Sequence, residues 1–182
     1  MIPEGINIIK NIATPKEISM FNLLVENPSK AIYSDNVSKS GKIYSKDMSN
    51  IVKDVLLRAY PIVKDKYDMD ISIPHETSFF TLKFTGSTTD RHYDDEFEKS
   101  RAISAIIYWN DNFEGGELLF PLQDWKYKPS PGDMVVFPST DKYYHHIQPT
   151  SGGFRYTTPY WYRYSSYRGQ RVNSWIKMKL FY

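Results

Sequence analysis

Five residues in the second half of the chain have the types and spacing of a metal site with an anion-binding group beside it. His92 and Asp94 form an H-x-D triplet, His145 and His146 follow much later, and Arg155 lies ten positions beyond His145. Two imidazoles and one carboxylate leave half of an iron coordination sphere open, which suits a chelating co-substrate and dioxygen. An arginine beyond them can hold a carboxylate through paired hydrogen bonds. The pattern therefore predicts a protein that activates oxygen.

The H-x-D triplet has a simple geometric interpretation. Residues two apart in an extended strand face the same way, so His92 and Asp94 can reach one ion while Tyr93 turns aside. Either His145 or His146 can supply the third ligand, but neighbours on a strand point to opposite faces, so we expect only one to do so. A bare H-x-D is also typical of an ordinary surface His and Asp beside a turn. The later histidine and arginine favour the metal site.

Composition limits the possible classes of protein. The 182 residues are enough for one domain with a sizeable core. The chain has no cysteine, which excludes disulfides, thiolate metal sites and a cysteine nucleophile. Basic and acidic residues nearly balance, at 23 and 21, so charge gives no reason to expect a nucleic-acid or membrane partner. No secretory signal or membrane-spanning run is evident. We expect a cytoplasmic protein.

Two helices are expected in the front of the chain. Residues 15–26 carry helically spaced apolar residues behind Thr14 and Glu17, which match a capping box. Residues 49–66 repeat the apolar pattern, although Pro61 is expected to bend or end that helix. The polar residues 34–49 between them predict a mobile loop that, with residues 86–91, orders over a bound substrate.

From residue 76 onward the pattern changes to short strands separated by Gly, Pro, Asn and Asp. Seven or eight short strands at this spacing favour a mainly β fold of the jelly-roll, cupin-like type rather than a parallel sheet. The expected organisation is a single domain, with a helical front (1–75), a β core (76–164) and a tail (165–182). The expected strands cover residues 79–84, 102–109, 117–120, 125–128, 134–137, 143–148 and 154–164.

The stretch 84–164 resembles the double-stranded β-helix core of the prolyl 4-hydroxylase group of iron(II)- and 2-oxoglutarate-dependent dioxygenases. The family landmarks occur here in the same order. They are H-x-D at residues 92–94, Y-x-N-D at 108–111, G-G-E at 115–117, F-P at 120–121, P-x-x-G at 129–132 and H-x-I-x-P at 145–149, followed by Arg155.

The resemblance implies a role for each matching residue. His92, Asp94 and His145 match the iron ligands, and His146 would then face away from the metal or support it indirectly. Arg155 matches the basic residue that binds the distal carboxylate of 2-oxoglutarate. Tyr108 matches a tyrosine that often assists that carboxylate, although plain core packing explains a strand tyrosine equally well.

Some features depart from the family pattern or have an ordinary explanation. Relatives commonly carry a tyrosine where Phe84 stands, so one hydroxyl near the co-substrate is missing. Trp161 matches a pocket-wall tryptophan but also suits an ordinary core position. Pro159 interrupts the last strand, which suggests an edge or a bulge. The charged residues 95–99 are expected to be solvated, and the aromatic and basic tail is expected to pack on the core or on a second subunit.

The activity implied by the resemblance is hydroxylation of a C–H bond, most plausibly on a prolyl residue of a peptide or protein. Iron(II) would be the cofactor and 2-oxoglutarate and O2 the co-substrates, with ascorbate as an optional addition. The alternatives are an oxygenase of free amino acids, nucleobases or other small molecules, a cupin-like metal-binding protein without oxygen chemistry, and a catalytically silent interaction module. Release of succinate would separate the oxygenases from the other two. The sequence leaves the substrate and the oligomeric state open.

Overall fold

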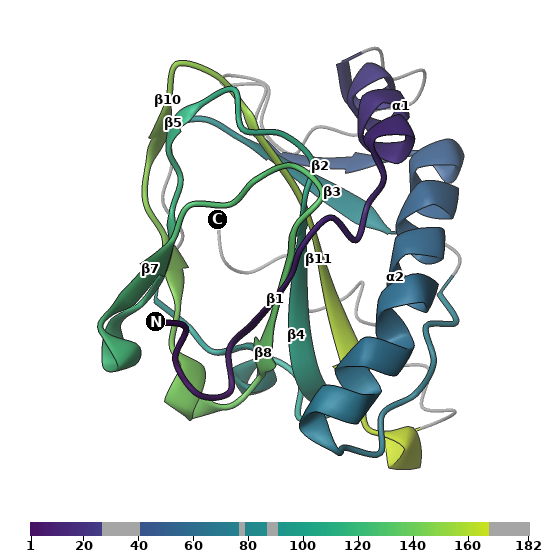
Figure 1. Ribbon diagram of the computed structural model, residues 1–182, viewed down its shortest axis with the longest axis vertical. Helices are drawn as coiled ribbons and strands as arrows, with labels where there is room; N and C mark the ends of the chain where they lie inside the picture. Colours follow the sequence, from purple (N-terminus) through teal and green to yellow (C-terminus); the bar gives the residue numbers. More distant parts are fainter. Residues whose placement is uncertain (27–40, 77–78, 87–90, 168–182) are drawn as a thin grey trace.

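The computed structural model describes residues 1–26, 41–76, 79–86 and 91–167 (Figure 1). Its helices are α1 (Pro15–Glu26) and α2 (Lys46–Tyr67). Its strands are β1 (Asn7–Ile9), β2 (Gly41–Tyr44), β3 (Phe80–Phe84), β4 (Arg101–Tyr108), β5 (Glu114–Gly115), β6 (Leu118–Phe120), β7 (Trp125–Tyr127), β8 (Met134–Pro138), β9 (His146–Ile147), β10 (Thr150–Ser151) and β11 (Arg155–Arg163).

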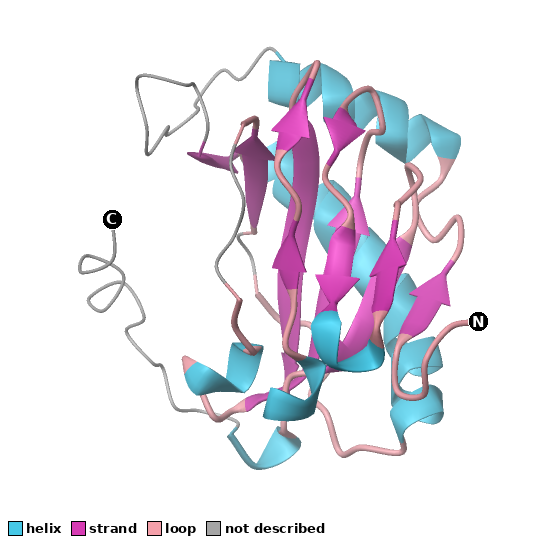
Figure 2. Ribbon diagram, turned by 90° about the vertical axis from the view of Figure 1, so that its left-hand side faces the viewer, coloured by secondary structure: helices cyan, strands magenta, loops and turns pink. Residues whose placement is uncertain are grey.

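The strands form one large antiparallel sheet and two small ones. The large sheet has the order β1-β8-β4-β11-β3-β2, and the small sheets pair β7-β6-β9 and β10-β5. Figure 1 shows the helices on one side of the large sheet and β5, β7 and β10 on the other. Seen from the side of the small sheets, the helices lie behind the large sheet (Figure 2). Sheets that face each other in this way form the sandwich expected from the strand pattern.

The two sides of strand β4 bury different hydrophobic cores. Ile103, Ala105 and Ile107 belong to the core between the large sheet and the helices. Ile106 and Tyr108 belong to a second core between the large sheet and the small sheets. Successive strand residues point to opposite faces, so a strand buried on both sides reads as a continuous apolar run. The second core supports the site described below.

Helix α1 begins with the predicted capping box. The backbone N–H of Thr14 donates to Glu17 Oε2 at 2.7 Å, and the backbone N–H of Glu17 donates to Thr14 Oγ1 at 3.2 Å. These two bonds satisfy donors that a helix start otherwise leaves without partners. The buried Phe21 then stacks on Trp109 of the β core, with ring centroids 3.7 Å apart. Capping and stacking together attach α1 to the sheet.

Helix α2 corrects one of the two expectations for Pro61, namely that it ends the second helix. The helix continues through Pro61 to Tyr67. A proline lacks the N–H that would bond to the carbonyl four residues back, but Pro61 lies on the exposed side, where water can replace that bond. Ala59 and Val63 stay buried on the opposite side. Burial of this apolar stripe outweighs the local penalty.

The predicted loop at residues 34–49 is also partly wrong. Residues 41–44 form β2, which pairs with β3, and helix α2 already begins at Lys46. Gly41 and Ile43 are buried in this strand. The remainder of the expected loop, 34–40, lies outside the described residues, as do 87–90 of the second expected loop and 168–182 of the tail.

Six of the seven predicted strands are confirmed, with ends shifted by at most one residue. The run 143–148 contains only the short strand β9, because Asp141–Tyr143 form a 3₁₀ turn. Pro159 neither ends β11 nor forms a bulge, since the pairing with β4 continues through it and the register shift lies between Tyr162 and Arg163. The sequence analysis did not predict β1, β2, β5 or β10. None of the helices in the described part of the chain combines the length and apolar character needed to cross a membrane.

Candidate metal centre

His92, Asp94 and His145 come together at one end of the sandwich. One ligand atom from each lies within 4.8 Å of the others. The backbones of the two histidines exchange hydrogen bonds, at 3.2 Å from His92 N to His145 O and 3.0 Å in the other direction. This antiparallel bridge brings together two segments that are far apart in the sequence. Such an arrangement is what the later histidine needs in order to join the H-x-D triplet.

The local backbone differs from the simple strand that was expected. His92 lies in an isolated bridge, Tyr93 is extended, and Asp94 is the first residue of the 3₁₀ turn η1 (Asp94–Glu96). The expectation of a strand through all three residues is therefore wrong. His92 and Asp94 still converge because the extended Tyr93 separates them. The following turn then directs the chain away from the cluster.

The spacing of the three side chains suits a metal ion. Asp94 Oδ1 lies 3.9 Å from His92 Nε2, and Asp94 Oδ2 lies 3.7 Å from His145 Nε2. Bonds from such atoms to a metal such as zinc are about 2.0–2.2 Å long, so one ion can bridge each of these pairs. The side chain of His92 is 26% exposed, against 7% for Asp94 and 5% for His145. Solvent therefore reaches the cluster from the His92 side.

His145 is held as a neutral ligand by its surroundings. Its Nδ1 lies 3.0 Å from the carbonyl oxygen of Tyr143, which can only accept a hydrogen bond, so Nδ1 carries the proton and Nε2 keeps its lone pair. The ring packs against Phe120 and Phe137. Burial lowers the pKa of His145, an effect that the Asp94 carboxylate partly opposes. The result is an imidazole whose Nε2 is available to a metal.

His146 is the neighbour that the sequence left as the alternative ligand. It lies in β9, paired with Leu119 of β6, and is not part of the described cluster of metal-binding groups. Its Nδ1 is buried without a hydrogen-bond partner in the described part of the chain. The alternation along the strand explains why only one of the two histidines reaches the cluster.

Arg155 begins β11 and is almost completely buried, at 1% exposure. Its Nη1 donates to Thr157 Oγ1 at 3.2 Å and its Nη2 to Tyr108 Oη at 3.5 Å, whereas its Nε has no partner among the described residues. Burial lowers the pKa of Arg155, yet a guanidinium remains charged in proteins. Within the described ranges no carboxylate pairs with it. A buried cation without a counter-ion is costly, so the arrangement suits an anionic ligand.

Tyr108 is packed in the core and also contacts Arg155. Its ring is fully buried in the core between the sheets, and its hydroxyl lies beside Arg155. Burial raises the pKa of Tyr108, so the phenol stays protonated. After accepting from Arg155, the hydroxyl can still donate its proton to a neighbouring oxygen. Core packing therefore positions a donor next to the guanidinium.

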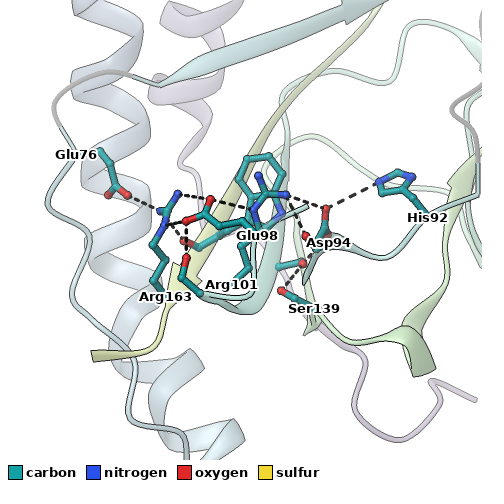
Figure 3. A network of polar contacts seen from close by, with 10 residues as sticks. Glu76, His92, Asp94, Glu98, Arg101, Ser139 and Arg163 are labelled. Carbon is teal, nitrogen blue, oxygen red and sulfur yellow. Dashed lines mark hydrogen bonds and ion pairs between the residues drawn. The ribbon is translucent and has the colours of Figure 1, made fainter. Parts of the chain in front are cut away.

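A polar network around Asp94 was not found from the sequence (Figure 3). The Arg101 guanidinium lies 3.8 Å from Asp94 Oδ1 and 3.6 Å from Glu98, and it stacks over the ring of Trp161 at 3.9 Å. The expectation that residues 95–99 are all solvated is wrong for Glu98, because Arg163 pairs with it at 3.1 Å. The spacing of these residues in the sequence did not predict the contacts, because they join the turn after the H-x-D triplet to the ends of β4 and β11.

Comparisons with known proteins agree with this fold. Residues 80–163 match the family model described as the 2OG-Fe(II) oxygenase superfamily. A stretch of 67 residues is 36% identical to prolyl 3-hydroxylase 2 of Rattus norvegicus and of Homo sapiens. That stretch covers 34% of this chain and 10% of each curated relative, so the chain matches about a tenth of their length.

Two solved structures share the fold at low sequence identity. The viral collagen prolyl hydroxylase of Paramecium bursaria chlorella virus-1, solved with 2OG, has a TM-score of 0.68 and 16% identity over 88% of this chain and 96% of the viral one. A prolyl hydroxylase of Trichoplax adhaerens, in complex with a hypoxia inducible factor peptide fragment, has a TM-score of 0.67 and 18% identity over 89% and 84%.

The chain has the double-stranded β-helix fold of these solved structures, and residues 80–163 match the model of the 2OG-Fe(II) oxygenase superfamily. Both the fold class and the family resemblance predicted from the sequence are thereby confirmed. The fit of the residues to iron rests on the donor set itself. Two imidazoles and one carboxylate form the triad typical of non-haem iron(II) oxygenases, and the buried Arg155 has no carboxylate partner among the described residues.

Proposed function

We propose that the protein is an iron(II)- and 2-oxoglutarate-dependent dioxygenase that hydroxylates a prolyl residue in a peptide or protein. The observation that carries the proposal is the pairing of the His92, Asp94 and His145 cluster with the buried, carboxylate-free Arg155 in one oxygenase-type domain. A dicarboxylic 2-oxo acid has the two features that this pair can bind, a chelating end and a distant carboxylate.

Each residue of the site has a specific task in this proposal. His92, Asp94 and His145 would hold the metal, which when bound supplies oxygen activation coupled to decarboxylation of the co-substrate. Arg155 would bind the distal carboxylate through its planar donors, and the Tyr108 hydroxyl would donate to it as well. The apolar core around Tyr108 excludes water and strengthens these charged hydrogen bonds.

The preference for a prolyl peptide rests on similarity of fold. The viral and Trichoplax proteins that share this fold are prolyl hydroxylases, and the Trichoplax protein was solved with a peptide fragment. The preference for a prolyl peptide follows from that similarity. The side chain of His92 is 26% exposed, so a substrate can approach the cluster from that side. Free amino acids and other small molecules remain the alternative substrate class. A cytoplasmic location and the organisation into a single domain stay predictions from the sequence.

Turnover assays separate these possibilities. The protein is supplied with iron(II), 2-oxoglutarate, ascorbate and a panel of proline-containing peptides, and succinate and peptide mass are measured together. The proposal expects succinate in step with a gain of one oxygen on a prolyl peptide, and no product with Asp94→Ala. Succinate stimulated only by a free amino acid would contradict the peptide substrate. Metal binding without any succinate would indicate the cupin-like alternative.

A further inference from the structure

Two buried serines form a chain of hydrogen bonds that ends on the Asp94 carboxylate. Ser104 Oγ donates to Asp94 Oδ2 at 2.6 Å, and Ser139 Oγ lies 2.8 Å from Ser104 Oγ. Both serines are 1% exposed. Ser104 stands in the middle of β4, and Ser139 follows β8, the neighbouring strand in the large sheet. Figure 3 shows Ser139 below Asp94, in the part of the network away from Glu76.

The number of protons fixes the direction of the chain. A hydroxyl has one hydrogen to donate, and an ionised carboxylate can only accept. Ser104 therefore uses its proton on Asp94, and Ser139 must be the donor in the contact between the two serines. Hydrogen bonds in series polarise one another, so the Ser139 bond strengthens the donation from Ser104. The chain thus acts on one oxygen of Asp94 from the interior of the sheet.

The backbone around Asp94 and Ser139 makes this arrangement rigid. The N–H of Asp95 donates to the carbonyl oxygen of Ser139 at 2.9 Å, and the N–H of Ser139 donates to the carbonyl oxygen of Ala102 at 3.0 Å. The turn that carries Asp94 is therefore tied to the same strands that carry the serines. The position of the carboxylate is set by the sheet and not by the turn alone.

We infer that Ser104 is a positioning residue for the metal centre, with Ser139 acting through it. Ser104 restrains rotation of the Asp94 carboxylate, so that the group is already oriented toward His92 and His145 before a metal binds. The inference deepens the proposed function and rests on it, because it assumes that Asp94 is a metal ligand. Groups that orient metal ligands in this way typically contribute 10- to 100-fold to metal affinity.

A purely structural role is the competing explanation, because any buried serine needs a hydrogen-bond partner. The two explanations predict different effects of a serine substitution on metal binding. A structural serine would change the stability of the protein alone, whereas a positioning serine changes both the affinity and the geometry of the bound ion. Ser49 offers a matched control, since it is 3% exposed and accepts a hydrogen bond from Phe79 N at 3.1 Å, on helix α2.

The test measures binding of Co(II) alone to the full chain under anaerobic conditions, by competition with a chelator and by the visible absorption of the bound ion. Ser104→Ala is expected to weaken Co(II) binding by about 10- to 100-fold and to alter the absorption spectrum at saturation. Ser104→Thr keeps a hydroxyl and should restore both properties. Ser139→Ala should weaken binding by a smaller factor, and Ser49→Ala should leave affinity and spectrum unchanged.

Asp94→Ala distinguishes failure of this inference from failure of the proposed site. If Asp94→Ala abolishes Co(II) binding while Ser104→Ala keeps the parental affinity and spectrum, the positioning role is overturned and the metal site stands. If Asp94→Ala binds Co(II) as the parent does, the ligand assignment and this inference both fall. If thermal unfolding without metal shows that Ser104→Ala does not fold, the test uses Ser139→Ala instead. The Ser139 hydroxyl acts on the Asp94 carboxylate only through Ser104. Parental affinity and spectrum in that variant would then overturn the inference.

Discussion

Arg155 Nη2 lies 3.5 Å from the hydroxyl of Tyr108, in a buried space where no described carboxylate balances the charge. The two residues come from neighbouring strands, β11 and β4. Folding alone has therefore enclosed a cation and a neutral donor side by side. An anion placed between the two side chains would pair with the guanidinium and accept a hydrogen bond from the hydroxyl. The pair therefore indicates that the co-substrate carries an anionic group at this position.

The first prediction concerns this pair and the binding of 2-oxoglutarate. Arg155→Ala should weaken binding by well over tenfold, because removal of one partner of a buried charge pair costs roughly 2–5 kcal/mol. Tyr108→Phe removes one hydrogen bond and should cost only about 1 kcal/mol or slightly more. Titration of the anaerobic iron(II) protein measures both effects, with metal affinity as the control. If Arg155→Ala binds 2-oxoglutarate as tightly as the parent, the role of Arg155 is wrong, and only the metal cluster supports a 2-oxoglutarate-dependent enzyme.

The second prediction separates the two adjacent histidines. His92→Ala, Asp94→Ala and His145→Ala should each abolish iron-dependent turnover, whereas His146→Ala should retain most of it. The reason is that His146 points from β9 away from the cluster. Succinate release measures the effect. Equal losses at His145 and His146 would contradict the assignment of the third ligand.

The third prediction concerns pH and Glu98. Burial alone would raise the pKa of Glu98, but hydrogen bonds from Arg163 and Ser100 outweigh it and lower the pKa. A folded-state pKa below the unfolded value stabilises the protein above the unfolded pKa, near 4.5, and this contribution disappears as the pH falls through the folded pKa. Glu98→Gln should therefore destabilise the protein at pH 7, by on the order of 1 kcal/mol.

Urea unfolding at several pH values tests this prediction. The difference between the parent and Glu98→Gln should shrink toward zero as the pH falls through the lowered pKa of Glu98. Glu96→Gln, on the exposed side of the same turn, serves as the control and should stay within about 0.5 kcal/mol of the parent at every pH. A difference for Glu98→Gln that is independent of pH would show that shape rather than charge is responsible.

The fourth prediction concerns the attachment of helix α1 to the β core. Phe21 is fully buried and stacks on Trp109, so Phe21→Ala should lower the free energy of unfolding by about 3–5 kcal/mol. Met20→Ala, on the exposed side of the same helix at 50% exposure, should change it by less than about 0.5 kcal/mol. Urea unfolding of both variants makes the comparison. Similar small losses would mean that α1 contributes little to the folded core.

Local patterns were enough to predict much of this protein from its sequence. Helix α1 with its Thr14 and Glu17 cap and six of the seven predicted strands all depend on residues close together in the chain. Side-chain periodicity and capping are local properties, so the sequence displays them directly. The ordered family landmarks added the fold and the oxygenase resemblance, which the match over residues 80–163 confirms.

Tertiary structure decided what depends on residues far apart in the chain. The continuation of α2 through Pro61 depends on which side faces water, and β1 and β2 are too short to be recognised without the strands that they pair with. The contacts of Ser104 and Ser139 with Asp94, and of Glu98 with Arg163, join separate segments. Their hydrogen bonds and ion pairs have no characteristic spacing, because only the packing of the sheet brings the partners within reach.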